Sequence, residues 1–428
     1  MKDDRMEKII SLCKRRGFLF QGSDIYGGLS GTWDFGPLGV QLKNTVKQEW
    51  WKMFVHGRTD MYGVESAILM NSKVWGVSGH VKNFSDPLID CKKCKRRFRA
   101  DHVENNTCPE CGAHDVTAAR PFNMMFKTHA GPVEDTGSEV YLRPETAQGM
   151  FVNFKNIVDS AHPKLPFGIA QIGKAFRNEI TPGNFIFRSR EFEQMEIEYF
   201  IREKEWNALF EQWLSEMHRW ISHIGLSKTH DREVARDALA HYSKRTVDID
   251  YEFPFGKEEL YGIAYRTDFD LMNHKEGSGV DISYIEEDGT KYIPHVIEPT
   301  FGGERTLLAL LCDAYTEEQL EKDMRTVLRF KPHIAPVTVA VFPLVSNKED
   351  IVKKAEEVAG LLRVSFRTAF DGIGNVGKRY RRQDEIGTPW CVTIDYDTLE
   401  NSTVTVRDRD TMKQCRIAIG ELSAYFSE

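Results

Sequence analysis

The sequence has 428 residues, of which 41% are hydrophobic and 28% are charged, a composition typical of a soluble globular protein with two or three domains. No apolar run approaches the roughly 20 residues that span a bilayer, and no apolar signal core follows the charged N-terminus. We therefore exclude a membrane protein and expect a cytoplasmic location. The formal charge of −7 gives no bulk attraction to a polyanion, which would have to bind local basic patches such as 92–99 and 378–382.

The first two thirds of the chain predict strands that cluster without regular alternation with helices. A helix is expected to begin at Gly36-Pro37-Leu38-Gly39, and a strand over 62–70 follows it. Two strands over 167–172 and 192–200 are joined by turn residues at 181–184, which predicts a hairpin. The remaining elements are a helix-rich stretch over 203–245, strands over 247–253, 261–265 and 295–299, and an apolar helix over 305–315. This order indicates an α+β fold with an antiparallel sheet.

The composition changes between Phe330 and Pro336, which indicates a linker. Beyond it strands and helices alternate, which predicts a small α/β domain of about 95 residues. The expected strands cover 337–342, 364–370, 390–394 and 404–408, and the expected helices cover 348–362, 376–385 and 412–426. We therefore predict a large domain over 1–330 with a polar insertion over 88–118, and a second domain over 335–428.

Four of the eight cysteines form two close pairs in the polar insertion. Each pair has the spacing Cys-x2-Cys, which supplies two thiolates from one turn, and two such turns satisfy a tetrahedral Zn²⁺. We predict a structural zinc ribbon with the ligands Cys91, Cys94, Cys108 and Cys111. Four thiolates leave no open position for catalysis. The alternatives are chance clustering and a redox pair.

The predicted hairpin carries several arginines. Arg177 and Phe192 can project from the same face of two antiparallel strands, where a guanidinium can hold a phosphate and an aromatic ring can stack on a purine. Arg188 and Arg190 in the turn can reach outer phosphates. A surface hairpin with solvated charges is the alternative, but clustered arginines repel one another unless an anion joins them.

A second block, Gly302-Gly303-Glu304-Arg305, stands between a strand and an apolar helix. The two glycines let the backbone approach a ligand closely. Arg305 is expected at the solvent-exposed end of a buried helix, where its charge can face a pocket. The alternative is an ordinary helix start with an exposed Glu304–Arg305 ion pair.

These blocks resemble the motifs of a known enzyme class. Phe176-Arg177-Asn178-Glu179 with Arg190-Glu191-Phe192 resembles motif 2 of the class II aminoacyl-tRNA synthetases, and Gly302-Gly303-Glu304-Arg305 resembles motif 3. The resemblance narrows to the dimeric glycyl-tRNA synthetases through four further segments: 22–28, 33–39, 142–149 and 192–196. The resemblance covers the chain from about residue 6 to the C-terminus. The smaller domain resembles the anticodon-binding domain that the glycine, threonine, proline and histidine enzymes share.

The resemblance implies a glycine–tRNA ligase with ATP as substrate, magnesium and structural zinc as metals, tRNA(Gly) as partner and a homodimeric assembly. Glycine would be activated as its adenylate and then transferred to the 3′ end of the tRNA. Arg177 and Arg305 would be the catalytic residues, through charge compensation. The implied ATP-binding residues are Arg177, Asn178, Glu179, Phe187, Arg188, Arg190, Phe192, Glu259, Leu260, Gly302, Gly303 and Arg305, with Glu259 also a candidate for magnesium.

A glycine pocket must hold the ammonium with carboxylates and leave no room beyond the α-carbon. The resemblance implies the substrate-binding residues Arg99, Glu145, Phe192, Glu193, Gln194, Met195, Glu196, Arg266, Glu298 and Thr300. Among them Glu145 and Glu298 would bind the ammonium. The sequence departs from the family at Thr300, where Ser is frequent, and over 62–70, which lacks the motif 1 proline of the dimer interface.

Two alternatives stay open. A class II synthetase for threonine or proline would share the fold, but a threonine enzyme would use a catalytic-site zinc with His ligands, which differs from an all-cysteine pattern. A non-enzymatic relative that keeps the fold to bind nucleic acid should have lost the ATP-binding arginines, whereas Arg177 and Arg305 are both present.

Overall fold

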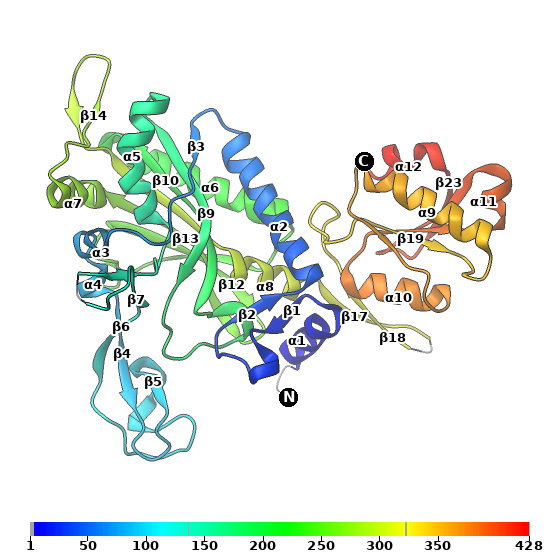
Figure 1. Ribbon diagram of the computed structural model, residues 1–428, viewed down its shortest axis with the longest axis horizontal. Helices are drawn as coiled ribbons and strands as arrows, with labels where there is room; N and C mark the ends of the chain where they lie inside the picture. The colour runs from blue at the N-terminus through cyan, green and yellow to red at the C-terminus, as the bar shows by residue number, and fades with distance from the viewer. Residues whose placement is uncertain (1–3, 136, 322, 428) are drawn as a thin grey trace.

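Two lobes and a projecting finger make up the molecule (Figure 1). The computed structural model describes residues 4–135, 137–321 and 323–427. Residues 1–3, part of the charged N-terminus on which the expected location rests, lie outside these ranges. Among the described residues, no helix has both the length and the apolar content that a membrane crossing requires.

The larger lobe is built on a seven-stranded sheet. Its strands lie in the order β11 (Thr229–Glu233), β12 (Arg245–Phe253), β13 (Gly256–Thr267), β16 (His295–Gly302), β10 (Glu191–Ile201), β9 (Phe167–Phe176) and β3 (Met61–Gly63). All neighbours are antiparallel except β3 and β9. The predicted antiparallel sheet and its hairpin of β9 and β10 are confirmed.

Strand β10 separates a hydrophobic core from a polar surface, because successive side chains of a strand point to opposite faces. The odd-numbered residues from Met195 to Ile201 are buried in the main core, whereas the even-numbered residues from Gln194 to Glu198 are polar. Helices α2 (Pro37–Trp51), α6 (Trp206–Ile224) and α8 (Gly303–Ala314) cover the core face, and α5 (Ala147–Ala161) and α7 (Phe269–Ser278) pack at one end of the other face. The polar stretch of β10 therefore faces an opening.

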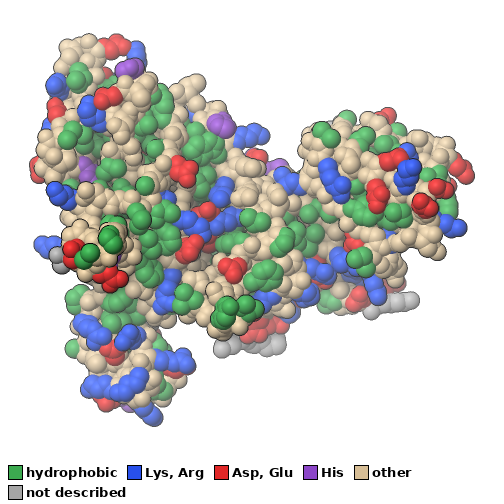
Figure 2. All heavy atoms as spheres, in the orientation of Figure 1, with side chains coloured by type: hydrophobic (Ala, Val, Ile, Leu, Met, Phe, Trp, Pro, Cys, Tyr) green, Lys and Arg blue, Asp and Glu red, His purple; other side chains and the backbone are tan. Residues whose placement is uncertain are grey.

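Shorter elements complete the larger lobe. They are α1 (Arg5–Arg16), β1 (Leu19–Gln21), β2 (Trp33–Phe35), α3 (Ser72–Val77), α4 (His80–Asn83), β7 (Lys127–His129), β8 (Glu139–Tyr141), β14 (Tyr284–Ile285) and β15 (Lys291–Tyr292). The finger is a three-stranded sheet of β5 (Arg97–Arg99), β4 (Ser85–Asp90) and β6 (Arg120–Asn123). Figure 2 shows many basic side chains on its outer part, which holds the exposed residues Lys92, Lys93, Lys95, Arg96 and Arg97.

The smaller lobe is a five-stranded mixed sheet with helices packed against it. Its strands lie in the order β20 (Thr368–Phe370), β19 (Val339–Pro343), β21 (Trp390–Ile394), β22 (Thr403–Asp408) and β23 (Gln414–Ala418), and its helices are α9 (Glu349–Arg363), α10 (Val376–Ile386), α11 (Tyr396–Asn401) and α12 (Leu422–Tyr425). Strands β19, β20 and β21 are parallel, since α9 and α10 connect them. This arrangement agrees with the α/β pattern predicted beyond Pro336.

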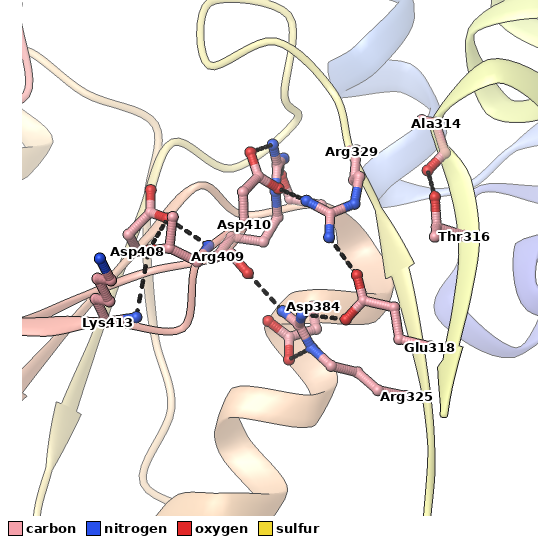
Figure 3. Close-up of polar contacts among 12 residues, drawn as sticks. Ala314, Thr316, Glu318, Arg325, Arg329, Asp384, Asp408, Arg409, Asp410 and Lys413 are labelled. Carbon is pink, nitrogen blue, oxygen red and sulfur yellow. Dashed lines mark hydrogen bonds and ion pairs between the residues drawn. The ribbon is translucent and has the colours of Figure 1, made fainter. Parts of the chain in front are cut away.

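A hairpin of β17 (Tyr315–Gln319) and β18 (Met324–Leu328) joins the larger lobe to the smaller one. Arg325 on β18 is 1% exposed and donates hydrogen bonds to Asp384 (2.8 Å), Glu318 (2.8 Å) and the backbone carbonyl of Arg409 (2.6 Å). Figure 3 shows these groups converging between the hairpin and the smaller lobe. The junction therefore depends on buried charges that are paired with one another.

Two elements of the larger lobe are shorter than predicted. The strand expected over 62–70 ends at Gly63, and beyond it the backbone N–H of Ser66 donates to the Gln171 side chain (3.1 Å) instead of extending the ladder. The helix-rich stretch expected over 203–245 ends with α6, and the edge strand β11 follows it.

Two elements of the smaller lobe also differ from the prediction. The strand expected over 364–370 begins only at Thr368. The helix expected over 412–426 is wrong, because residues 414–418 form β23, and only a short 3-10 turn (Ile419–Glu421) and the α-helix Leu422–Tyr425 follow it. Pairing with β23 covers the edge of β22, which would otherwise present unpaired backbone groups. This tertiary pairing overrides the local sequence pattern.

Candidate active site

A cleft opens on the polar face of the seven-stranded sheet. One part has a volume of about 170 Å³ and lies between β10, the β9–β10 turn and the start of α8. The other part, of about 300 Å³, is bordered by Glu145, β13 and β16. Four residues line both parts, which therefore form one continuous cleft: Arg177, Gln194, Glu259 and Thr300. We call the first the arginine part and the second the acidic part.

Arg177 and Arg305 come from distant stretches of the chain and meet at the arginine part. The Arg177 guanidinium lies 5.2 Å from the centre of the Phe192 ring, and the Arg305 guanidinium lies 4.5 Å from the centre of the Phe187 ring. Glu259 holds Arg305 through its backbone carbonyl (2.8 Å) and its carboxylate (3.1 Å). The prediction that Arg177 and Phe192 share a face of the hairpin is confirmed.

Of the two arginines in the turn, only Arg188 lines the cleft. Arg190 lines neither part, because its guanidinium donates to the backbone carbonyls of Ser30 (2.6 Å) and Glu179 (3.1 Å). Asn178 also lines neither part. The structure therefore does not place Arg190 and Asn178 in the cleft lining, and their roles in ATP binding stay predictions.

The other residues predicted to bind ATP surround the arginine part. Those that line it are Glu179, Phe187, Phe192, Glu259, Leu260, Gly302 and Arg305. Gly303 begins α8 beside β10, where an added Cβ would lie 3.1 Å from the carbonyl oxygen of Glu193, so glycine allows this close approach. Burial raises the pKa of Glu179 above its ordinary value against the opposing charges of Arg177 and Arg188.

The acidic part gathers more buried carboxyl groups than cations. Arg266 is 1% exposed and forms ion pairs with Asp270 (2.8 Å) and Glu298 (2.7 Å), so it acts on the cleft through Glu298. Glu145 forms an ion pair with His80 (3.2 Å). Burial opposes ionisation of Glu145, but the charge and hydrogen bond of His80 prevail and hold the pKa of Glu145 below its usual range.

Two further carboxyl groups on β10 form no ion pair within the described part of the chain. Glu196 accepts a hydrogen bond from Gln194 (2.8 Å), and neither oxygen of Glu198 has a hydrogen-bond partner there. Burial, together with the charges of Glu298 and Glu145, raises the pKa of Glu196 to about 8. Burial also raises the pKa of Glu198 well above its ordinary value. The acidic part therefore has the character of a site for a cation.

Three side chains predicted to bind substrate point elsewhere. Met195 is 0% exposed in the main core, because the alternation of β10 directs it away from the cleft. Glu193 also points to that side, where its carboxylate pairs with Lys43 of α2 (3.0 Å). Arg99 lies on β5 of the finger and pairs with Asp86 (2.7 Å). None of the three residues lines the acidic part, although Glu193 lines the arginine part. Their roles in substrate binding stay predictions.

The sequence analysis missed three features of the site. Glu198 continues the even-numbered polar positions of β10, so the strand pattern could have identified it. Lys43 and Glu304 form a buried ion pair (2.8 Å) that fixes α2 against the start of α8. Neither this pair nor the contact of His80 with the acidic part has a local sequence signal.

The four cysteines of the finger converge as predicted. The Sγ atoms of Cys91 and Cys111 lie 3.7 Å apart, as do those of Cys94 and Cys108, and all four lie within 4.8 Å of one another. A tetrahedron with Zn–S bonds of about 2.3 Å has edges of about 3.8 Å. The geometry of these thiols therefore fits Zn²⁺.

Comparison with known proteins agrees with this geometry. The family described as "tRNA synthetase class II core domain (G, H, P, S and T)" matches residues 126–314, and the family described as "Anticodon binding domain" matches residues 338–428. The fold is similar to that of Giardia lamblia prolyl-tRNA synthetase, with a TM-score of 0.72 and 16% identity over 98% of this chain and 76% of that one. The sheet, the cleft and the smaller lobe thus define a class II aminoacyl-tRNA synthetase.

Curated relatives narrow the class to one family. The chain is 52% identical to glycine–tRNA ligase of Treponema denticola, over 97% of this chain and 95% of that protein. It is also 52% identical to the same enzyme of Clostridium tetani, over 99% and 98% of the two chains, and 49% identical to that of Bacillus cereus, over 99% and 98%. The chain belongs to the glycine–tRNA ligase family.

Proposed function

We propose that the cleft binds ATP in its arginine part and glycine in its acidic part, and that the protein joins glycine to tRNA(Gly) through glycyl-adenylate. One observation carries the proposal: a site with free guanidinium groups is continuous with a site that has an excess of buried negative charge. The two halves suit the phosphates of ATP and the ammonium of an amino acid, respectively. Shared residues such as Arg177 would lie where the two substrates react.

In the first step the glycine carboxylate attacks the α-phosphorus of ATP and pyrophosphate leaves. The carboxylate is already an anion, so the step requires alignment and charge compensation instead of a general base. The Nε of Arg177 donates a hydrogen bond to the Pro144 carbonyl (3.1 Å), and its terminal amino groups have no hydrogen-bond or ion-pair partner among the described residues. We assign Arg177 to the α-phosphate and Arg188 to the γ-phosphate.

The adenine would lie against Phe192 and Arg305, whose flat groups suit stacking and cation–π contact. Glu259, with 47% of its side chain exposed beside Arg305, offers oxygen ligands of the kind that magnesium prefers. Magnesium bound there would neutralise charge on the phosphates of ATP.

The glycine ammonium would lie among Glu145, Glu196 and Glu298, which all line the acidic part. Thr300 lines the same region, with its hydroxyl 3.4 Å from the Glu196 carboxylate. A side chain on the substrate would have to occupy the space next to Thr300 and Glu196. We therefore infer that these residues select glycine by excluding larger amino acids.

In the second step the 3′ hydroxyl of the tRNA would attack the carbonyl of the adenylate, which forms the ester bond to glycine and releases AMP. The smaller lobe would bind the anticodon, and the zinc ribbon of the finger would serve a structural role. A homodimeric assembly and a cytoplasmic location complete the proposal.

Exchange of pyrophosphate into ATP, measured with each amino acid in turn, tests the proposed substrate. We expect exchange with glycine alone. Comparable exchange with alanine or serine would contradict the role of the acidic part, and exchange with no amino acid would contradict the proposed function.

A further inference from the structure

A second group of potential metal ligands lies where the chain leaves the larger lobe. Glu49, His223 and His333 each offer one ligand atom, and these atoms lie within 4.8 Å of one another. The Nε2 of His223 is 2.9 Å from a Glu49 oxygen, and the rings of His223 and His333 have centroids 4.6 Å apart. None of the three lines the cleft, so the group is separate from the proposed substrate site.

Three separate segments supply these side chains. Glu49 lies on α2, His223 lies in the last turn of α6, and His333 lies in the segment that leads from β18 into the smaller lobe. The C-terminal end of a helix carries partial negative charge, so the end of α6 favours a cation beside His223. All three side chains are half-buried, which leaves solvent access for an ion to enter and leave.

The hydrogen bonds of His333 and its neighbours favour ligation. The Nε2 of His333 lies 3.1 Å from the backbone carbonyl of His223. When Nε2–H donates to this carbonyl, Nδ1 keeps its lone pair, and such a hydrogen bond from the second ring nitrogen orients metal-bound imidazoles in general. The nearby cations are already engaged, since Lys331 donates to the carbonyl of Ser222 (2.6 Å) and Arg367 donates to the carbonyl of His333 (2.9 Å).

We propose that Glu49, His223 and His333 form an exchangeable Zn²⁺ site at the junction of the two lobes. Two imidazoles and one carboxylate suit Zn²⁺ and leave its fourth position to water. Binding of the ion replaces the hydrogen bond between Nε2 of His223 and the Glu49 carboxylate, and the proton of this hydrogen bond passes to solvent. The bound ion ties α2 and α6 to the segment that carries the smaller lobe.

The chain contains a matched control for this site. His218 lies on the same helix α6 and pairs with the Asp231 carboxylate at 3.0 Å, much as His223 pairs with Glu49. No third ligand of the kind that completes a metal site joins this pair among the described residues. A His–carboxylate pair alone should bind Zn²⁺ far more weakly than three converging ligands.

The experiment uses the full-length protein without an affinity tag. After dialysis against buffered Zn²⁺, metal analysis should find one more zinc per chain in the wild type than in His223→Ala or His333→Ala, while His218→Ala matches the wild type. Calorimetric titration with Zn²⁺ should give a Kd roughly 100-fold weaker, or no binding, in the two site variants. Co²⁺ bound at this site should lack the thiolate charge-transfer band of the cysteine site, which distinguishes the two centres.

Circular dichroism and melting without added metal establish that each variant is folded. Zn²⁺ should then raise the melting temperature of the wild type and of His218→Ala, but not that of His223→Ala. Equal zinc content in the wild type and both site variants would overturn the proposal. A wild type that takes up no zinc beyond the cysteine site would also overturn it.

Discussion

Glycine binding should release a proton, because Glu196 must ionise to hold the ammonium. Burial and the charges of Glu298 and Glu145 raise the pKa of Glu196 to about 8, so roughly 1% of the molecules carry an ionised Glu196 at pH 6 and about half do at pH 8. If the ionised form binds glycine, the Kd for glycine falls about 50-fold between these pH values, or about 2 kcal/mol. Affinity therefore rises with pH in this window.

The substitution Glu196→Gln preserves the shape of the side chain and removes its ionisation. Calorimetric titration with glycine at pH 6, 7 and 8, in two buffers of different ionisation enthalpy, measures both the Kd and the number of protons released. We expect the wild type to show a change of about 50-fold, about 2 kcal/mol, together with proton release. Glu196→Gln should bind weakly at every pH, with a nearly constant Kd.

A matched control lies on the same strand. Glu191 is exposed at the start of β10 and pairs with Lys174 (2.5 Å), so Glu191→Gln should keep the pH dependence of the wild type. The reasoning would be refuted by a wild-type Kd that is constant from pH 6 to pH 8 without proton release. A pH dependence that persists in Glu196→Gln would assign the titration to another carboxyl group.

Three further substitutions test the nucleotide site, the zinc ribbon and the lobe junction. Arg177→Ala should lower kcat for pyrophosphate exchange about 100- to 1,000-fold with an unchanged melting temperature, and a wild-type rate would remove its phosphate role. Cys108→Ser should reduce the zinc content by one ion per chain, and unchanged metal analysis would contradict the four-thiolate centre. Arg325→Met should lower the free energy of unfolding by about 3 kcal/mol, because it leaves Asp384 with Arg407 as its remaining ion-pair partner. An unchanged midpoint in urea would show that the buried network is energetically neutral.

The parts of the site that the sequence predicted are those with local signals. The hairpin of β9 and β10 follows from strand alternation and turn residues. The two glycines at the start of α8 were predicted to approach a ligand; Gly302 lines the cleft, and Gly303 packs against β10. The contact between Lys43 and Glu304 joins residues 261 positions apart, and no local pattern specifies which charges meet across such a distance. The same holds for His80 beside Glu145, which changes the charge balance of the acidic part.

Alternation along a strand also explains why some residues of the motif on β10 do not line the cleft. A motif that spans consecutive residues of β10 includes both faces, and only every second side chain can reach the cleft. Met195 belongs to the motif and packs in the core, whereas Glu198 lies beyond the motif and is fully buried near Glu196 and Glu298 of the acidic part. Geometry therefore divides the motif residues into those whose side chains line the cleft and those whose side chains pack on the other face of the sheet.

Ionisation of Glu196 opposes the stability of the fold. A carboxyl group whose pKa is raised in the folded state binds its proton more tightly there than in the unfolded chain, so its contribution to stability falls as the pH rises above the unfolded value. For Glu196, with a rise from 4.5 to about 8, the loss approaches about 5 kcal/mol when the group is fully ionised. The hydrophobic face of β10, together with helices α2, α6 and α8 that cover it, must supply enough stability to hold the buried carboxyl groups of the acidic part close together. In the proposed function, an ammonium that enters the acidic part would compensate the charge of Glu196 and so offset part of this loss.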